Sequence, residues 1–158
     1  ADEIRVATNP RYRDMSALVE SLPVFVAPEE IVNIRRGVES GVRVGPKVME
    51  YIAKIVDATR NPCNYQINYV VMRSGEREEK RAVGVGISAG ASPRATQDLA
   101  HASRFVAWIN NRDYVIPDDV RNLAYDILLH RIFFAPGLFR RSSVAKSFLT
   151  SVLSNVEF

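Results

Sequence analysis

Four segments of the chain begin at a proline and continue with apolar residues at helical spacing, and this pattern constrains the fold most strongly. Proline fits the first position of a helix because its missing N–H has no helical partner there. The pattern predicts helices that begin at Pro28, Pro46, Pro93 and Pro117, with a further helix over about 143–154. In the second segment, five apolar residues share one helix face: Val48, Tyr51, Ile52, Ile55 and Val56.

The ends of these helices are also marked in the sequence. Asn61 precedes Pro62, and a residue before proline avoids the helical region, so the second helix is expected to stop there. Asn111 tolerates the left-handed conformation that often ends a helix, which places the end of the third helix near Asn110. Its buried face is predicted to contain Ala95, Leu99, Ala102, Val106 and Ile109, widened by Phe105 and Trp108.

Residues 65–88 have a different character from the helical segments around them. Residues 65–71 favour a strand, a turn signal follows at 74–76, and residues 82–87 predict the returning strand. The sequence therefore predicts a mainly α-helical bundle with an inserted β-hairpin over about 65–88.

The length of 158 residues, of which 47% are hydrophobic, suits one globular domain with a core of its own. We assign a helical domain to 27–158 with the hairpin insertion at 65–88. Residues 1–26 have no clear period beyond a candidate helix over 14–22 and are expected to be an N-terminal segment or linker. The opening Ala1-Asp2-Glu3 lacks an initiator Met, which is expected of a piece of a longer protein.

Charge and cysteine content narrow the functional classes. The 21 basic and 18 acidic residues give a net charge of +3, which tolerates a nucleic-acid partner without requiring one. Cys63 is the single cysteine and there are two histidines, so a disulfide framework and a metal site are not expected. No signal peptide or apolar run of membrane-spanning length is present, and a reducing, cytoplasmic setting is predicted.

The chain shows no complete catalytic constellation. Residues 41–47 superficially suggest a phosphate loop, but Pro46 stands where glycine is required before the lysine and donates no N–H. Gly84-Val85-Gly86 lacks the spacing of a dinucleotide fingerprint. Neither Ser142-Ser143 nor Cys63 has a His–Asp pairing nearby in the sequence, and His130-Arg131 is expected to stabilise the last turn of the fourth helix. The chain alone is therefore not expected to be an enzyme.

Arg94 is the residue whose charge disagrees with its position. Ser92 is a predicted N-cap and Pro93 a first helical residue, so Arg94 falls in the first turn of the third helix. A helix N-terminus carries a partial positive charge and favours acidic residues instead. Exposed N–H groups beside a guanidinium would form a phosphate site, and a merely solvated arginine is the equally weighted alternative.

Three blocks of sequence carry a resemblance to a known family. Residues 90–95 (GASPRA), 111–120 (NRDYVIPDDV) and 129–132 (LHRI) resemble the C-terminal lid of MoxR-type AAA+ ATPases, relatives of the magnesium-chelatase ATPase subunit. Residues 28–31 and 51–60 look like the first lid helices, and the resemblance covers roughly residues 24–135.

The resemblance implies a set of roles and partners. Arg94 matches the sensor-2 arginine, which reaches from the lid to the γ-phosphate held by the core domain, and Ser92 and Pro93 shape the start of its helix. ATP and Mg²⁺ are implied for the full-length protein, with none bound by this fragment alone. The implied partners are the AAA+ core domain of the same protein and neighbouring subunits of a ring, usually a hexamer. Family members act as chaperones that remodel or mature protein complexes, often with a von Willebrand factor A-domain protein.

The chain also departs from the family pattern. Walker A, Walker B, sensor 1 and the arginine finger have no counterpart, so the catalytic core of the implied ATPase lies outside this chain. Ile116 replaces the usual Thr cap, Asn111 replaces the usual Gly, and the hairpin over 65–88 is longer than the usual connection. The hairpin is either a contact for a partner or subunit, or an inert insertion.

Two alternative functions can be compared with the sequence. A basic helical nucleic-acid-binding module would gather its cations on one helix face and bind with a steep salt dependence, whereas this sequence disperses them. A protein-interaction scaffold that docks through the hairpin edge is compatible with a lid.

Overall fold

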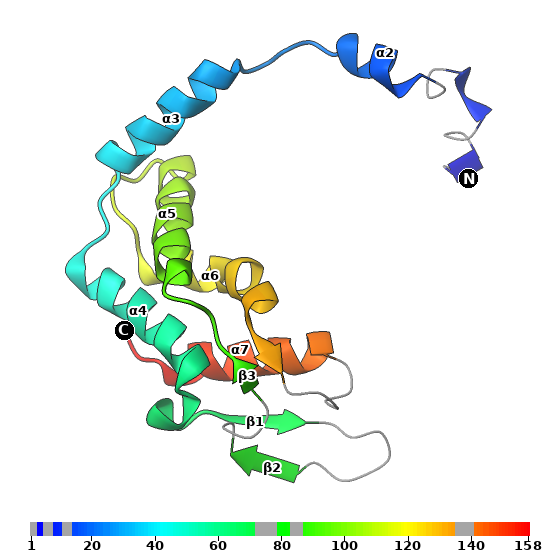
Figure 1. The fold of residues 1–158 in the computed structure, drawn as a ribbon. Helices are drawn as coiled ribbons and strands as arrows, with labels where there is room; N and C mark the ends of the chain where they lie inside the picture. Colours follow the sequence, from blue (N-terminus) through cyan, green and yellow to red (C-terminus); the bar gives the residue numbers. More distant parts are fainter. Residues whose placement is uncertain (1–2, 5–7, 11–13, 72–78, 83–86, 135–140) are drawn as a thin grey trace. The chain divides into compact units, whose positions relative to one another are not determined.

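A computed structural model describes residues 3–4, 8–10, 14–71, 79–82, 87–134 and 141–158 (Figure 1). The chain divides into two compact units, Ala1–Arg36 and Gly37–Phe158, here called the N-terminal and C-terminal units. In the N-terminal unit, helix α2 (Met15–Glu20) is capped by Asp14, whose Oδ1 accepts a hydrogen bond from the Ala17 N–H at 3.0 Å. Helix α3 (Pro28–Gly41) begins at its predicted proline.

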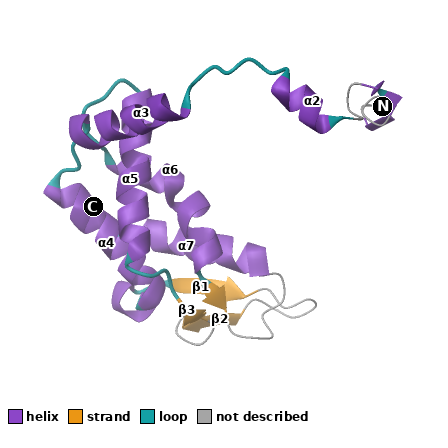
Figure 2. Cartoon of the chain, turned by 45° about the horizontal axis from the view of Figure 1, so that its top comes forward, coloured by secondary structure: helices purple, strands orange, loops and turns teal. Residues whose placement is uncertain are grey.

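The main elements of the C-terminal unit are the helices α4 (Pro46–Arg60), α5 (Arg94–Ile109), α6 (Pro117–Leu128) and α7 (Arg141–Asn155). Helix α4 contacts the other three, and α6 lies against both α5 and α7, with the short strands grouped beyond them (Figure 2). The predicted helical bundle with a β-hairpin is confirmed. Within the described residues, every helix is too short or too polar to cross a membrane.

The core confirms the predicted face of α4 and corrects that of α5. The five apolar residues predicted for α4 are all buried. On α5 the predicted Ala95 and Leu99 are buried, together with Ala100, Ser103 and Ala107, which were not predicted. Trp108 and Ile109 are 47% and 69% exposed, so their predicted burial is wrong. The buried stripe has small residues because α5 lies against α6, and small side chains allow two helices to approach closely.

The predicted hairpin is present, with strand bounds that differ from the predicted ones. Strand β1 (Asn68–Val71) pairs antiparallel with β2 (Glu79–Ala82), from Asn68 opposite Ala82 to Val71 opposite Glu79. The first strand starts later than predicted because Pro62–Tyr65 forms a 3₁₀ turn, η2, which Gln66 ends with a positive φ of 51°.

The end of the predicted second strand belongs to a different sheet. Strand β3 (Ile87–Ala89) pairs with β4 (Phe133–Phe134), with Ile87 opposite Phe134, and residues 83–86 lie outside the described residues. The Ser88 hydroxyl also donates to the Phe133 carbonyl at 3.1 Å. Pairing partners more than forty positions apart leave no local pattern in the sequence, which is why this contact was not predicted.

Asn111 ends α5 as the sequence predicts. Its φ is +56°, and its N–H donates to the Trp108 carbonyl at 2.9 Å while the Arg112 N–H donates to the Ala107 carbonyl at 2.9 Å. These two bonds form a Schellman motif, in which one left-handed residue satisfies the last carbonyl groups of a helix. The chain is thereby turned toward α6.

The left-handed conformation of Asn111 gives a first prediction. Asn111→Val should lower the free energy of unfolding by about 1–2 kcal/mol, because the left-handed region is strained for a β-branched residue. Asn111→Gly should change it by less than about 0.5 kcal/mol, since glycine adopts this region freely. Urea unfolding followed by circular dichroism compares the two variants, and equal stability of both would contradict the role of this turn.

Candidate functional site around Arg94

Arg94 is the first residue of α5, and its side chain is exposed. Within the described part of the chain, its guanidinium makes no hydrogen bond or ion pair, although other cationic side chains such as Arg112 and Arg131 are paired. A positive charge is unfavourable beside the N-terminal N–H groups of a helix. The structure therefore leaves Arg94 available to an anion from outside the chain.

The predicted cap of α5 is corrected by one residue. Pro93 is the N-cap, with helical dihedral angles of φ −55° and ψ −26°, and no side-chain oxygen caps the helix. Ser92 contributes its carbonyl instead, which accepts from the Ala95 N–H at 2.9 Å, and the Pro93 carbonyl accepts from the Thr96 N–H at 3.1 Å. Ser92 was predicted to cap with its hydroxyl, but a proline already in the helical conformation places the start of the helix at Arg94.

The backbone before Arg94 is anchored directly to the end of α4. Buried Thr59 accepts a hydrogen bond at its Oγ1 from the Ala91 N–H at 2.9 Å, and its hydroxyl donates to the Val56 carbonyl at 2.7 Å. Gly90 lies so close that a Cβ there would stand 2.5 Å from the Thr59 carbonyl carbon and 2.7 Å from the Arg60 nitrogen. Only glycine allows this approach, so Gly90 and Thr59 fix where α5 begins.

Two further ties hold the first turns of α5. Asp98, one turn after Arg94, pairs with Arg131, whose Nη1 lies 2.7 Å from Asp98 Oδ2. Strand β3, which leads into α5, pairs with β4. Helix α6 ends at Leu128, and Leu129–Arg131 forms a 3₁₀ turn, η4. Arg131 was predicted to stabilise the last turn of the fourth helix by its charge. In the structure, Arg131 lies in η4 and joins η4 to α5 through its ion pair with Asp98.

A buried ion pair fixes the connection between α5 and α6. Arg112 donates from Nη1 to Asp119 Oδ2 at 2.9 Å and from Nη2 to Oδ1 at 2.6 Å. The Ile116 N–H donates to the same Oδ2 at 2.9 Å, so the Asp119 carboxylate satisfies the N-cap N–H of α6, while the Asp119 N–H donates to the Ile116 carbonyl at 3.1 Å. Burial alone would raise the pKa of the Asp119 carboxyl, but the hydrogen bonds from Arg112 and Ile116 outweigh burial and hold that pKa below its usual value.

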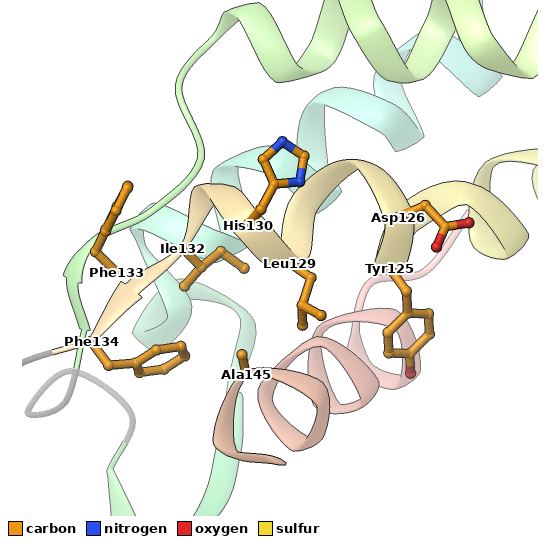
Figure 3. A pocket seen from close by; sticks show the side chains of 8 residues that line it. All are labelled: Tyr125, Asp126, Leu129, His130, Ile132, Phe133, Phe134 and Ala145. Carbon is orange, nitrogen blue, oxygen red and sulfur yellow. The ribbon is translucent and has the colours of Figure 1, made fainter. Parts of the chain in front are cut away.

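A hollow of about 480 Å³ is lined by residues of α6, η4, β4 and α7. In Figure 3, Leu129, Ile132 and Ala145 surround it, whereas the His130 ring and the Asp126 carboxylate point away from each other. Its lining is mostly apolar and contains no nucleophile beside a base. Within the described residues, no three His, Cys, Asp or Glu side chains gather as a metal site would require.

Among the described residues, the arrangement around Arg94 can bind an anion, and no group of ligands there would hold a metal. An exposed guanidinium at a helix N-terminus fits a phosphate oxygen, so the donor set is compatible with the terminal phosphate of a nucleotide. The described residues present no comparable set for Mg²⁺. Sequence reasoning found Arg94 but missed Thr59, Asp98 and Arg131 as its supports, because their partners lie more than thirty positions away.

Comparisons with known proteins show the family to which the chain is related. Residues 79–147 match the model of the AAA lid domain family. Over 137 residues, covering 86% of this chain and 38% of the relative, the chain is 31% identical to the protein MoxR of Paracoccus denitrificans. It is 34% identical to chaperone MoxR1 of Mycobacterium tuberculosis over 85 residues, which is 54% of this chain and 19% of that protein.

A solved structure agrees with the sequence relatives. The crystal structure of a candidate ATPase from Cytophaga hutchinsonii superimposes with a TM-score of 0.73 at 27% identity, over 99% of this chain and 43% of that chain. The chain spans about two fifths of the length of the MoxR proteins of Paracoccus denitrificans and Methylorubrum extorquens. The chain thus belongs to the MoxR family of AAA+ ATPases, and it carries the lid region of that family.

Proposed function

We propose that Arg94 is the sensor-2 arginine of a MoxR-like ATPase and contacts the γ-phosphate of ATP held by the AAA+ core domain of the same protein. The observation that carries this proposal is an exposed guanidinium, without a partner in the described residues, on a helix start anchored to α4. Leaving a cation unpaired beside helix N–H groups costs stability. A transient anionic partner explains why the cost is tolerated.

The anchoring of Arg94 gives the lid its mechanical role. ATP with Mg²⁺ supplies the phosphoryl group that is transferred to water. Arg94 stabilises the negative charge that develops on this group, as arginines do in other phosphoryl-transfer sites. Because Gly90 and Thr59 join the start of α5 to α4, a force on Arg94 moves the helices of the lid together.

The movement of the lid is then passed on to partners. We place this lid in a ring of subunits, such as a hexamer, in which each lid lies between its own core domain and a neighbouring subunit. The complete protein would use ATP hydrolysis in the cytoplasm to remodel or mature protein complexes, together with a von Willebrand factor A-domain protein. The name of the relative chaperone MoxR1 supports the chaperone-like part of this proposal.

Removal of the Arg94 guanidinium tests the proposal. In the full-length protein, Arg94→Ala is expected to lower kcat/KM for ATP by about a hundredfold, as the loss of one charge-stabilising donor does elsewhere. Steady-state phosphate release measures the effect. Circular dichroism should show an unchanged helical content, because the Arg94 side chain has no partner in the described residues.

Lys47 offers a matched control. It is an exposed cation in the first turn of α4, so Lys47→Ala removes the same charge from the first turn of another helix. We expect its ATP turnover to stay within about twofold of the wild type, since surface charges away from a site have small effects. Normal hydrolysis by Arg94→Ala, or an equal loss in Lys47→Ala, would remove the sensor-2 assignment.

A further inference from the structure

Asp98 is the acidic residue best placed to compete with a phosphate for Arg94. It follows Arg94 by four residues on α5, and side chains four apart lie on the same face of a helix. It is also the only acidic residue between Glu79 and Asp113 in the sequence. An arginine and an aspartate at this spacing attract each other. Arg94 nevertheless makes no ion pair within the described residues.

Arg131 forms an ion pair with the carboxylate of Asp98. Its Nη1 lies 2.7 Å from Asp98 Oδ2, with the two side chains only 28% and 35% exposed. Its Nε also donates to His130 Nε2 at 3.2 Å, which fixes the orientation of the guanidinium. Arg131 is further held by its place in η4, which is followed by strand β4 and its pairing with β3. The partner of Asp98 is therefore supplied by a separate, well-anchored segment.

We infer that Arg131 is a positioning residue, which acts through Asp98 to keep Arg94 free for the nucleotide phosphate. This inference rests on the proposed function of Arg94. Without Arg131, the Asp98 carboxylate would be free to pair with Arg94, and the loss of the positive charge of Arg131 would make the net charge near the incoming phosphate more negative. Both effects oppose phosphate binding. Arg131 belongs to the LHRI block at 129–132, for which the sequence indicated only a structural role at the end of a helix.

Three variants of the full-length protein test the inference by rescue. Arg131→Met should lower kcat/KM for ATP by about fivefold, because it releases the Asp98 carboxylate near the phosphate. The double variant Arg131→Met/Asp98→Asn should match Asp98→Asn alone, and both should be more active than Arg131→Met, because neither of them contains the released carboxylate. If the ion pair only stabilises the fold, Asp98→Asn should lose as much activity as Arg131→Met, and the double variant should not recover. That pattern would overturn the inference.

A second measurement needs no ATP. Nuclear magnetic resonance of the 158-residue chain measures the rate at which the Arg94 Nε–H exchanges with water. We expect exchange to slow by about twofold in Arg131→Met, as Arg94 pairs with Asp98, and to return to the wild-type rate in the double variant. Equal rates in all three chains would overturn the inference even if Arg94 senses ATP. Normal turnover by Arg94→Ala would instead overturn the proposed function, whatever the exchange rates show.

Discussion

Replacing Gly90 by alanine is expected to lower the free energy of unfolding of the C-terminal unit by about 3 kcal/mol, the upper part of the range for overpacked sites. The added Cβ would overlap the carbonyl group of Thr59 and stand 2.7 Å from the Arg60 nitrogen. Backbone atoms cannot rotate away as a side chain can. The end of α4 and the start of α5 would therefore have to separate.

The separation would break a second interaction. The Ala91 N–H, now bonded to Thr59 Oγ1 at 2.9 Å, is buried and would lose its acceptor. A buried donor without a partner is costly. The two losses act at the same place, just before Arg94, so the full-length Gly90→Ala protein should also lose ATP turnover even under conditions in which it remains folded.

Gly45→Ala is the matched control for this prediction. A Cβ at Gly45 would meet no atom within 4 Å, and Gly45 has an ordinary φ of −64° at the N-cap of α4. Its free energy of unfolding should change by less than about 0.5 kcal/mol. Urea unfolding followed by circular dichroism measures both variants. Wild-type stability of Gly90→Ala would show that α4 and α5 do not meet as closely as described.

Gly90 also shows what the sequence could and could not predict. The helices were predictable because their starts and ends are local: proline at Pro46 and Pro117, and a left-handed asparagine at Asn111. Within the GASPRA block, Arg94 could be singled out because its positive charge is unfavourable at the start of a helix. In contrast, the close approach of Gly90 to Thr59 depends on how two helices cross, and a single sequence does not encode that crossing in any short pattern.

The errors in the prediction have the same origin. Residue 87 continues a strand-like run, but its partner is Phe134 rather than the neighbouring strand of the hairpin. Trp108 and Ile109 extend an apolar helix face by spacing, yet they are exposed, whereas Ala107 in the same turn of α5 is buried. Periodicity indicates which residues share a helix face. It does not indicate which of them a neighbouring helix covers.

Replacing Asp119 by alanine is expected to lower the free energy of unfolding by about 3 kcal/mol. The carboxylate accepts three hydrogen bonds, two from Arg112 and one from the Ile116 N–H, and only 5% of its side-chain surface is exposed. Its removal leaves the Ile116 N–H without this acceptor, and it leaves the partly buried Arg112 guanidinium with the Tyr114 carbonyl as its remaining partner among the described residues. Asp119→Asn retains an acceptor for the Ile116 N–H, so its loss should be smaller.

Asp118→Asn provides the control for charge alone. Asp118 precedes Asp119 in the first turn of α6 but is exposed. Its substitution removes the same charge from the same helix end and should change the free energy of unfolding by less than about 1 kcal/mol. If Asp118→Asn were as destabilising as Asp119→Ala, the helix dipole rather than the ion pair would account for the effect.

The pH dependence of stability further separates the contribution of the Arg112–Asp119 ion pair from that of the helix dipole. The pKa of Asp119 is lower in the folded state than its ordinary value of 3.8, because the hydrogen bonds from Arg112 and Ile116 outweigh the opposing effect of burial. The unfolded chain therefore binds a proton at Asp119 more readily than the folded chain does. The stabilisation is complete well above pH 4 and is lost as the pH falls through the folded pKa. The stability difference between wild type and Asp119→Asn, measured by urea unfolding from pH 7 to pH 2.5, should be constant near neutrality and shrink below about pH 4. A difference that stays constant to pH 2.5 would contradict the lowered pKa and, with it, the ion pair that joins α5 to α6.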